Sequence, residues 1–446
     1  MSHTLNPINL SVDAVIIGGG IAGLLTFRHL KNMGKSVLLF EKTALGSGQT
    51  LASQGIIHGG SKYALQGKLS EAAETVAQMT SIWGEYLAGG LKSGVDLSGV
   101  KILSPHHYLW ASGFGASLKT LISSKVLSSD NRVLKPAEYP EIFQYSGSLG
   151  SFSGSLCELD EVVLDVQSLL EKLIGEDQDY LIQMDDHWEF RYSTNEANEA
   201  NEAIEGKRIE EIIYQNQEIK FSLTARSYLF MAGEGNEPFL KQMGQSLEPA
   251  MQKRPLKMVM VKHPALRPIY AHYVGMGTVP ELTVTSHPLS DDSNAEKQQW
   301  IWYLGGAIAE EGVSRPDAEQ YLAAVKLMKQ RFPWLLDKIN FEEAEYALLE
   351  INRAEVFNHG KRPDSYGIVE RGNALFAWPT KLTLAPALVH EVMKKISFCL
   401  ESSDREKNQD SLSQNLGHYL NQLPKAFIAK APWENTQWEK IPYVAT

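Results

Sequence analysis

The feature that most constrains the fold of this chain is a glycine-rich turn that follows its first apolar run. Residues 12–17 are rich in Val and Ile, a composition that predicts a short buried strand. Residues 18–23 read Gly-Gly-Gly-Ile-Ala-Gly, a helix is predicted over 21–32, and a second apolar strand over 36–40. Such a strand–helix–strand unit of about 30 residues packs its strands in parallel. The chain is therefore expected to begin with an α/β domain.

The turn matches the pattern G-x-G-x-x-G, and it lies between a predicted strand and a predicted helix, as the dinucleotide-binding pattern requires. Gly18 permits the tight turn out of the strand, Gly20 lets the backbone approach a pyrophosphate, and Gly23 lets the helix and strand pack closely. The helix N-terminus, at Ile21 and Ala22, offers unpaired N–H groups and a partial positive charge to phosphates. These features predict a dinucleotide site.

An acidic residue follows at the spacing that a ribose requires. Glu41 ends the second predicted strand 18 residues after the last glycine, close to the spacing of about 20 residues at which an acid binds the ribose hydroxyls. Lys42 comes next, but an acid at Glu41 disfavours a 2′-phosphate. Thr50 and Ser53 carry hydroxyl groups that could reach the pyrophosphate or a ribityl chain.

Three segments of the chain together resemble one superfamily, the D-amino-acid oxidase-like FAD-dependent oxidoreductases. Residues 53–63 are similar to the Ser-x-x-x-(Ile/Val)-His-x-Gly segment of glycerol-3-phosphate dehydrogenases and L-2-hydroxyglutarate oxidases. Residues 232–236 resemble an Ala-Gly turn that returns to the cofactor, and residues 377–386 resemble the C-terminal flavin segment. The resemblance spans roughly residues 12–398.

The resemblance implies that FAD is the cofactor and that the site is assembled from separate parts of the sequence. The cofactor-binding residues it implies, together with those of the glycine turn, are Gly18, Gly20, Ile21, Ala22, Gly23, Glu41, Lys42, Thr50, Ser53, Gly55, Gly233, Lys381, Leu382 and Thr383. One departure is Trp378-Pro379-Thr380, which replaces the family's Gly-His-Gly run. The substrate of neither subfamily is therefore carried over.

The chemistry implied is removal of a hydride from a carbon that bears OH or NH, with the flavin as acceptor. His58 lies in a segment that the family places against the flavin. Three roles stay open for it: a base that takes the substrate's proton, covalent attachment to the flavin, or a contact without a proton role.

Two basic residues are candidates for binding an anionic substrate. Arg353 follows a predicted strand and could hold a carboxylate through its planar fork, or it could pair with Glu355 or another acid. Lys381 resembles a lysine of sarcosine-oxidase relatives that serves the flavin or a substrate carboxylate; a surface lysine is the alternative. Further candidates to line the cavity are Tyr63, His106, His107, Tyr108, Tyr270, His272 and Tyr273.

The expected fold class is α/β (α+β): a Rossmann-like FAD-binding domain with an interleaved, mixed or antiparallel substrate-binding sheet. Helices are predicted over 69–87, 318–332 and 386–400, a hairpin over 208–214 and 219–223, and antiparallel strands over 256–261, 282–286 and 300–304. The FAD domain is assigned to 10–100, 155–245 and 355–400, the substrate domain to 101–154 and 246–354, and a tail that wraps the surface or is partly disordered to 401–446. Three Asn-Glu-Ala triplets at 195–203 indicate a solvated loop.

Composition narrows the classes of partner. The net charge of −11 argues against binding of nucleic acid. Two distant cysteines, Cys157 and Cys399, support neither a disulfide framework nor a cysteine metal site, and no metal is expected. The first 11 residues lack a signal-peptide pattern and no apolar run is long enough to span a bilayer. A cytoplasmic protein is expected, with peripheral contact to a membrane left open.

The first functional hypothesis is an FAD-dependent dehydrogenase or oxidase of a small anionic hydroxy acid, amino acid or glycerol-3-phosphate-type metabolite. The alternatives are an FAD enzyme that acts on a macromolecule such as modified RNA, and a flavin-binding protein without turnover. The electron acceptor, oxygen or a quinone, stays open.

Overall fold

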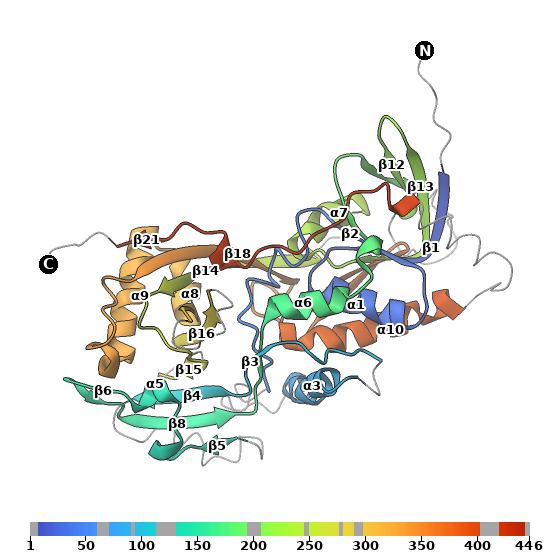
Figure 1. The fold of residues 1–446 in the computed structure, drawn as a ribbon. Helices are drawn as coiled ribbons and strands as arrows, with labels where there is room; N and C mark the ends of the chain where they lie inside the picture. The colour runs from blue at the N-terminus through green and yellow to red at the C-terminus, as the bar shows by residue number, and fades with distance from the viewer. Residues whose placement is uncertain are drawn as a thin grey trace.

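The structure is a computed structural model. It describes residues 8–59, 71–90, 94–112, 131–193, 207–244, 249–275, 280–289, 298–401 and 419–441. The Asn-Glu-Ala triplets, Tyr63 and the side chain of Cys399 lie outside this description. Two large sheets lie side by side, each with its own helices (Figure 1).

The first sheet contains the strand–helix–strand unit predicted from the glycine turn. In the described part of the chain its strands run in the order β10-β2-β1-β13-β12-β11, and β20 joins β13 to β19. Neighbours from β10 to β13, and β13 with β20, are parallel, whereas β11, β12 and β13 pair antiparallel. The strands are β1 (Ile8–Ile17), β2 (Val37–Glu41), β10 (Leu181–Gln183), β11 (Trp188–Ser193), β12 (Arg208–Gln215), β13 (Lys220–Phe230), β19 (Gly367–Arg371) and β20 (Ala374–Trp378).

Apolar helices form a continuous core with this sheet. The helices are α1 (Ile21–Asn32), α3 (Glu71–Leu87), α6 (Val166–Ile174) and α10 (Ala385–Glu401). Their fully buried side chains include Leu25, Trp83, Leu169 and Leu388, and all four belong to one cluster with residues of β1 and β2. Helix α1 has the bounds predicted from the sequence.

Strand β13 differs from its prediction. The sequence predicted a strand over 219–223, but the structure has one strand of 11 residues that continues through the polar interval at 224–227 to Phe230. The polar interval is kept extended because β13 pairs with β1 from Phe221 to Phe230, and these backbone hydrogen bonds do not depend on side-chain polarity.

The second sheet is largely antiparallel, as predicted. Its described strands run in the order β21-β18-β14-β17-β16-β15-β4-β8-β5, and only β15 and β4 among them pair in parallel. The strands are β4 (His107–Ser112), β5 (Arg132–Val133), β8 (Gly154–Leu159), β14 (Met251–Lys262), β15 (Ala271–Tyr273), β16 (Leu282–Pro288), β17 (Trp300–Gly305), β18 (Glu345–Val356) and β21 (Glu439–Lys440). The fold class predicted from the sequence is therefore confirmed.

An aromatic core joins the second sheet to helix α9 (Asp317–Arg331), whose predicted position is confirmed. Trp110, Trp302 and Trp334 are fully or almost fully buried in it. Helix α8 (Ala307–Gly312) packs over β14 of the same sheet. Strand β8 belongs to this sheet, so the domain boundary expected at residue 155 falls inside one of its strands.

The described part of the C-terminal tail, residues 419–441, runs along both sheets and is red in Figure 1. The Gln183 amide donates to the Pro424 carbonyl at 2.8 Å, and β21 pairs with β18. Leu420 and Leu423 are buried against the first sheet. The tail thus wraps the surface as an ordered segment. Its apolar residues contact the first sheet, and β21 pairs with the second. None of the described helices is long and apolar enough to cross a membrane.

Candidate active site

The glycine turn lies at the C-terminal ends of β1 and β13, where side chains are excluded. Gly18 has φ +112°, and a Cβ there would lie 2.5 Å from the Cα of Ala232. A Cβ on Gly23 would lie 1.9 Å from the Gly18 carbonyl oxygen. Only glycine fits at either position, and the backbone consequently packs strand against helix without intervening side chains.

The N-terminus of α1 is open toward an anion. Gly20 is the N-cap and provides no side-chain hydrogen bond, and the first turn holds no acidic residue. The Ile21 amide donates to the hydroxyl of Thr50 at 3.0 Å. Among the described residues, the amides of Gly20, Ala22 and Gly23 find no acceptor. Unpaired amides at a helix start are the donors that a pyrophosphate requires, so the residues present fit a dinucleotide.

Glu41 is oriented by the turn itself. Its two carboxylate oxygens accept from the amides of Gly19 at 2.7 Å and Thr43 at 2.8 Å. A carboxylate has about four acceptor positions, so two remain for ribose hydroxyls. The side chain of Lys42 is exposed beside it.

A cavity of about 400 Å³ adjoins Lys42. Its aromatic wall contains Trp188, Phe190, Tyr192 and Phe239. A cavity with several aromatic side chains in its wall, beside the acid that ends β2, is suited to an aromatic base at the far end of a dinucleotide.

The three segments singled out from the sequence meet at one edge of the first sheet. Gly55 has φ +69°, and a Cβ there would lie 2.2 Å from the Leu164 carbonyl oxygen. The His58 amide donates to the hydroxyl of Thr383 at 2.8 Å, and the indole of Trp378 donates to the Gly233 carbonyl at 3.0 Å. Residues near positions 55, 233 and 383 are therefore brought together by the ends of parallel strands.

The run that departs from the family pattern has an unusual backbone. Thr380 has φ +63°, a left-handed conformation that favours glycine, and its hydroxyl donates to the Ser365 carbonyl at 2.8 Å. Lys381 follows, half-buried, as the N-cap of a short 3₁₀ turn at Leu382–Leu384 that leads into α10. Ser53 is also half-buried.

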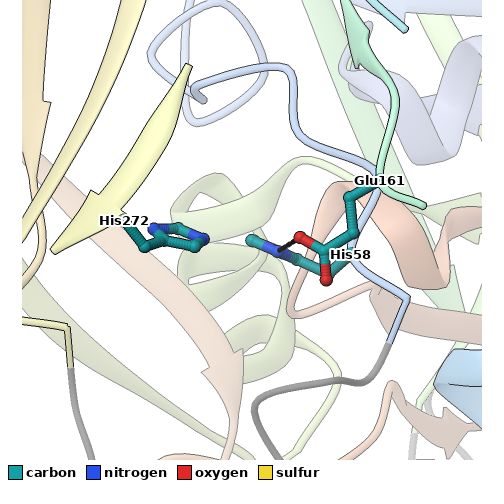
Figure 2. Close-up of side chains that lie close together, drawn as sticks. All are labelled: His58, Glu161 and His272. Atoms are coloured by element: carbon teal, nitrogen blue, oxygen red, sulfur yellow. Dashed lines mark hydrogen bonds and ion pairs between the residues drawn. The ribbon is translucent and has the colours of Figure 1, made fainter. Parts of the chain in front are cut away.

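His58 faces a buried acid and a second histidine (Figure 2). Its Nδ1 lies 3.2 Å from Oε2 of Glu161, and the Gly59 amide donates to Oε1 of the same carboxylate at 2.9 Å. The Glu161 residue is 1% exposed. His272, on β15, stacks on His58 with ring centroids 5.8 Å apart and an interplanar angle of 19°. The two halves of the protein thus each contribute an imidazole.

The second histidine is itself held in place. His272 is fully buried, and its Nδ1 lies 2.7 Å from the hydroxyl of Thr283 on β16. The ring of His107 lies 4.0 Å from that of His272. His107 and His272 are candidates to line the cavity from the sequence alone. Glu161 is not, because a single acid between two strands belongs to no motif. Its only signal is an acid directly before the apolar pair Val162-Val163.

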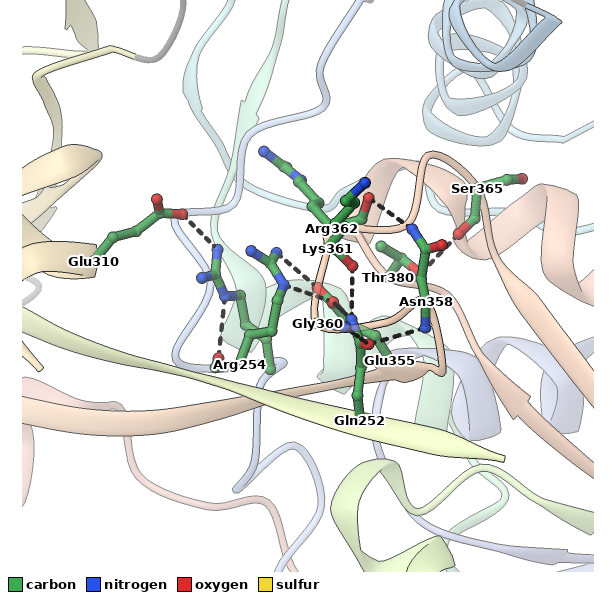
Figure 3. Close-up of polar contacts among 11 residues, drawn as sticks. Gln252, Arg254, Glu310, Glu355, Asn358, Gly360, Lys361, Arg362, Ser365 and Thr380 are labelled. Carbon is green, nitrogen blue, oxygen red and sulfur yellow. Dashed lines mark hydrogen bonds and ion pairs between the residues drawn. The ribbon is translucent and has the colours of Figure 1, made fainter. Parts of the chain in front are cut away.

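Arg353 lies in a second polar cluster, on β18 opposite Arg254 of β14. Figure 3 labels Arg254 and Glu310 of this cluster. Its Nη1 donates to Glu310 at 3.0 Å and its Nε to the Arg254 carbonyl at 3.3 Å. Burial, followed by repulsion from Arg254, lowers the pKa of the Arg353 guanidinium. The alternative in which Arg353 pairs with an acid is therefore present in the structure, with Glu310 as the acid. Glu355 instead pairs with Arg254 at 2.7 and 2.9 Å.

A loop connects this cluster to the flavin segment. The side-chain oxygen of Gln252 accepts from the amides of Asn358 and Gly360, both at 2.9 Å, and its nitrogen donates to the Lys361 carbonyl at 2.7 Å. The same loop reaches Thr380 through Ser365, as Figure 3 shows. The structure therefore brings His58, Lys381 and Thr383 to one strand edge and places Arg353 on the neighbouring sheet.

Comparison with known proteins gives a consistent result. Residues 13–177 match the family model DAO, described as FAD dependent oxidoreductase. The chain is 37% identical over 432 residues to a probable FAD-dependent oxidoreductase of Pseudomonas aeruginosa, covering 96% of this chain and 99% of the relative. A crystal structure of an FAD-dependent oxidoreductase from Pseudomonas aeruginosa superimposes with a TM-score of 0.73 at 32% identity, covering 96% of this chain and 99% of that one.

More distant structures share the fold. Iminodiacetate oxidase from Chelativorans sp. BNC1 has a TM-score of 0.57 at 14% identity, over 90% of this chain and 98% of that one. L-α-glycerophosphate oxidase from Mycoplasma pneumoniae, solved with FAD bound, has a TM-score of 0.54 at 15% identity, over 87% and 95%.

Proposed function

This chain belongs to the DAO family of FAD-dependent oxidoreductases, and on that premise we propose that it removes a hydride from a C–OH or C–NH carbon of a small anionic metabolite. When bound, FAD supplies the acceptor for the hydride, which carries both electrons. The glycine turn, Glu41 and the segment around Thr383 would hold the cofactor. The protein's own side chains bind and orient the substrate and accept its proton.

The observation that carries the proposal is the contact between His58 and the buried Glu161. If Nδ1–H of His58 donates to this carboxylate, the opposite ring nitrogen, Nε2, bears the lone pair and can accept the proton of the substrate's OH or NH group. Glu161 then stabilises the imidazolium that forms, and it fixes the ring orientation in the same way that a carboxylate orients the histidine of a hydrolase triad. Glu161 is a positioning residue in this scheme.

Arg353 supports an anionic substrate. It uses Nη1 and Nε for Glu310 and the Arg254 carbonyl, and its Nη2 finds no acceptor among the described residues. The carboxylate of Glu310 is 42% exposed, and ion pairs with an exposed partner contribute only about 0–1 kcal/mol. A substrate carboxylate or phosphate could therefore replace or share this contact, with Lys381 as a second cation. The names of iminodiacetate oxidase and glycerophosphate oxidase also indicate anionic substrates for those proteins.

The test is anaerobic bleaching of the bound flavin by panels of hydroxy acids, amino acids and glycerol-3-phosphate, each paired with a neutral amide, ester or alcohol of the same skeleton. At least one anion is expected to reduce the flavin, and its neutral partner to react far more slowly. Equal rates for the neutral and anionic partners would refute the anionic-substrate part. Failure of every small molecule, with reduction by modified RNA, would replace the proposal by a macromolecular substrate.

A further inference from the structure

We propose that His58, Glu161 and His272 form a binding site for a divalent transition-metal ion, with Zn²⁺ as its probe. One nitrogen or oxygen atom from each of the three side chains lies within 4.8 Å of the others. No metal was expected from the sequence, since the three residues come from distant segments and share no ligand spacing. The site exists only because the first and second sheets bring these segments together.

The donor set is that of a three-ligand zinc site. Zinc binds imidazole nitrogen at about 2.0–2.1 Å and carboxylate oxygen at about 2.0–2.2 Å, so two ligand atoms on a tetrahedral ion lie about 3.4 Å apart. The His58 nitrogen and Glu161 oxygen, 3.2 Å apart, already have this separation. The His272 ring is directed toward this pair in Figure 2, and it needs to approach by about 1–1.5 Å to complete the set.

Two of the proposed ligand side chains are themselves held by hydrogen bonds, as metal-binding side chains usually are. The hydroxyl of Thr283 contacts Nδ1 of His272 at 2.7 Å, which orients the ring and leaves Nε2 as its ligand atom. The Gly59 amide donates to Oε1 of Glu161, and Oε2, which contacts Nδ1 of His58, is the oxygen that would bind the ion. Glu161 and His272 are at most 1% exposed, so solvent water does not compete for the hydrogen bonds that orient them.

Charge favours an ion at this position. One carboxylate and two neutral imidazoles carry a net charge of −1, and a divalent ion reverses it to +1 while leaving a fourth position for water. The ion takes the place of the proton at Nδ1 of His58, and that proton moves to Nε2 of the same ring, so the imidazole stays neutral. If the proposed function holds, the ion also prevents His58 from accepting the substrate's proton, so Zn²⁺ is expected to inhibit flavin reduction reversibly.

The test is equilibrium dialysis of the FAD-loaded protein against Zn²⁺, without substrate. We expect one ion per chain and a loss of affinity in His272→Gln and Glu161→Gln of at least the 10–100-fold that removal of an outer-shell partner costs. Thr283→Val, which retains all three ligands, is expected to weaken binding by about 10–100-fold. His187→Gln is the matched control, because His187 pairs with Asp185 at 3.1 Å on the surface, and it should bind Zn²⁺ as the wild type does.

The outcomes separate this proposal from the proposed function. Zn²⁺ affinity unchanged in both folded ligand variants, judged by circular dichroism and FAD content, would overturn the metal site. If His272→Gln failed to fold, the Glu161→Gln and Thr283→Val variants would still decide the matter. Zn²⁺ binding that depends on these residues, in a protein whose His58→Ala variant reduces flavin normally, would keep the metal site and reject the base.

Discussion

The backbone amide of His58 donates a hydrogen bond of 2.8 Å to the hydroxyl of Thr383, a residue 325 positions further along the chain. The bond joins the segment after β2 to the turn that begins α10. Thr383 is fully buried, so the amide has no water to replace its partner. The placement of His58 therefore depends on a side chain near the other end of the protein.

Replacement of Thr383 tests this dependence. Thr383→Val removes the acceptor and leaves a buried amide unpaired, which should cost about 1–3 kcal/mol of folding stability. Thr383→Ser keeps the hydroxyl and is the control. We expect a lower urea midpoint and slower flavin reduction in the valine variant. Equal stability and rate in all three proteins would show that the contact is unimportant.

His58→Ala should slow flavin reduction by about 10²–10⁴-fold, the usual contribution of a general base. Because His58 accepts a proton only when neutral, the wild-type rate should rise with pH as the imidazole loses its proton. Stopped-flow reduction at several pH values measures both effects. A change in the rate of flavin reduction below about threefold, far under the usual contribution of a general base, would rule out His58 as the base. Flavin that stays attached to denatured wild type, but not to His58→Ala, would support a covalent link instead.

Gly20→Val should abolish FAD binding. A Cβ at this position already lies 3.2 Å from the Thr50 hydroxyl, and a branched side chain there would occupy the space in front of the open amides of α1. Gly84→Ala, on α3 with nothing within 4 Å of the added Cβ, is the control and should retain FAD. Flavin absorbance of the purified proteins measures the result, and a fully yellow Gly20→Val protein would mean that the pyrophosphate site is elsewhere.

Arg353→Ala should raise the substrate KM strongly without loss of FAD. Removing one partner of a buried charged pair costs about 2–5 kcal/mol, or about 30- to several-thousand-fold in affinity. Arg132→Ala, which removes a half-exposed arginine paired with Glu138 and Glu158, is the control. Steady-state kinetics with the substrate found by bleaching measure the effect. An unchanged KM would leave Arg353 as a structural partner of Glu310.

His287 should make the protein less stable in acid. Burial lowers the pKa of His287 to about 3, whereas an unfolded histidine titrates near about 6.5. The unfolded chain therefore binds the proton first, so the stability that neutral His287 contributes is present above about pH 6.5 and is lost as the pH falls toward about 3. Urea midpoints between pH 7 and 4 should fall less steeply in His287→Gln. Parallel pH profiles would contradict this account.

The sequence predicted the fold best where the contacts that determine it lie close together along the chain. The turn at residues 18–23, helix α1 and the acid at Glu41 follow from steric and hydrogen-bonding demands within about 30 residues. The family, the cofactor and the class of enzyme implied by the resemblance of residues 53–63, 232–236 and 377–386 are confirmed.

The sequence could not predict contacts that depend on how the two sheets meet. His58, Glu161 and His272 are separated by about 100 residues each, and no propensity or spacing connects them. The same reason explains β13, whose polar middle is extended only because β1 lies beside it. The roles of His58, Arg353 and Lys381 stay predictions.

The C-terminal segment at residues 419–441 also protects the protein from self-association. It covers β10, the edge of the first sheet, through hydrogen bonds from Gln183 to Pro424 and from Ala426 to Leu181, and β21 covers part of the edge strand β18. Uncovered edge strands present rows of unsatisfied amides and carbonyls that recruit strands of other molecules. One short segment therefore keeps an edge of each sheet from acting as a template for aggregation, and a chain shortened before residue 419 should lose solubility at high concentration.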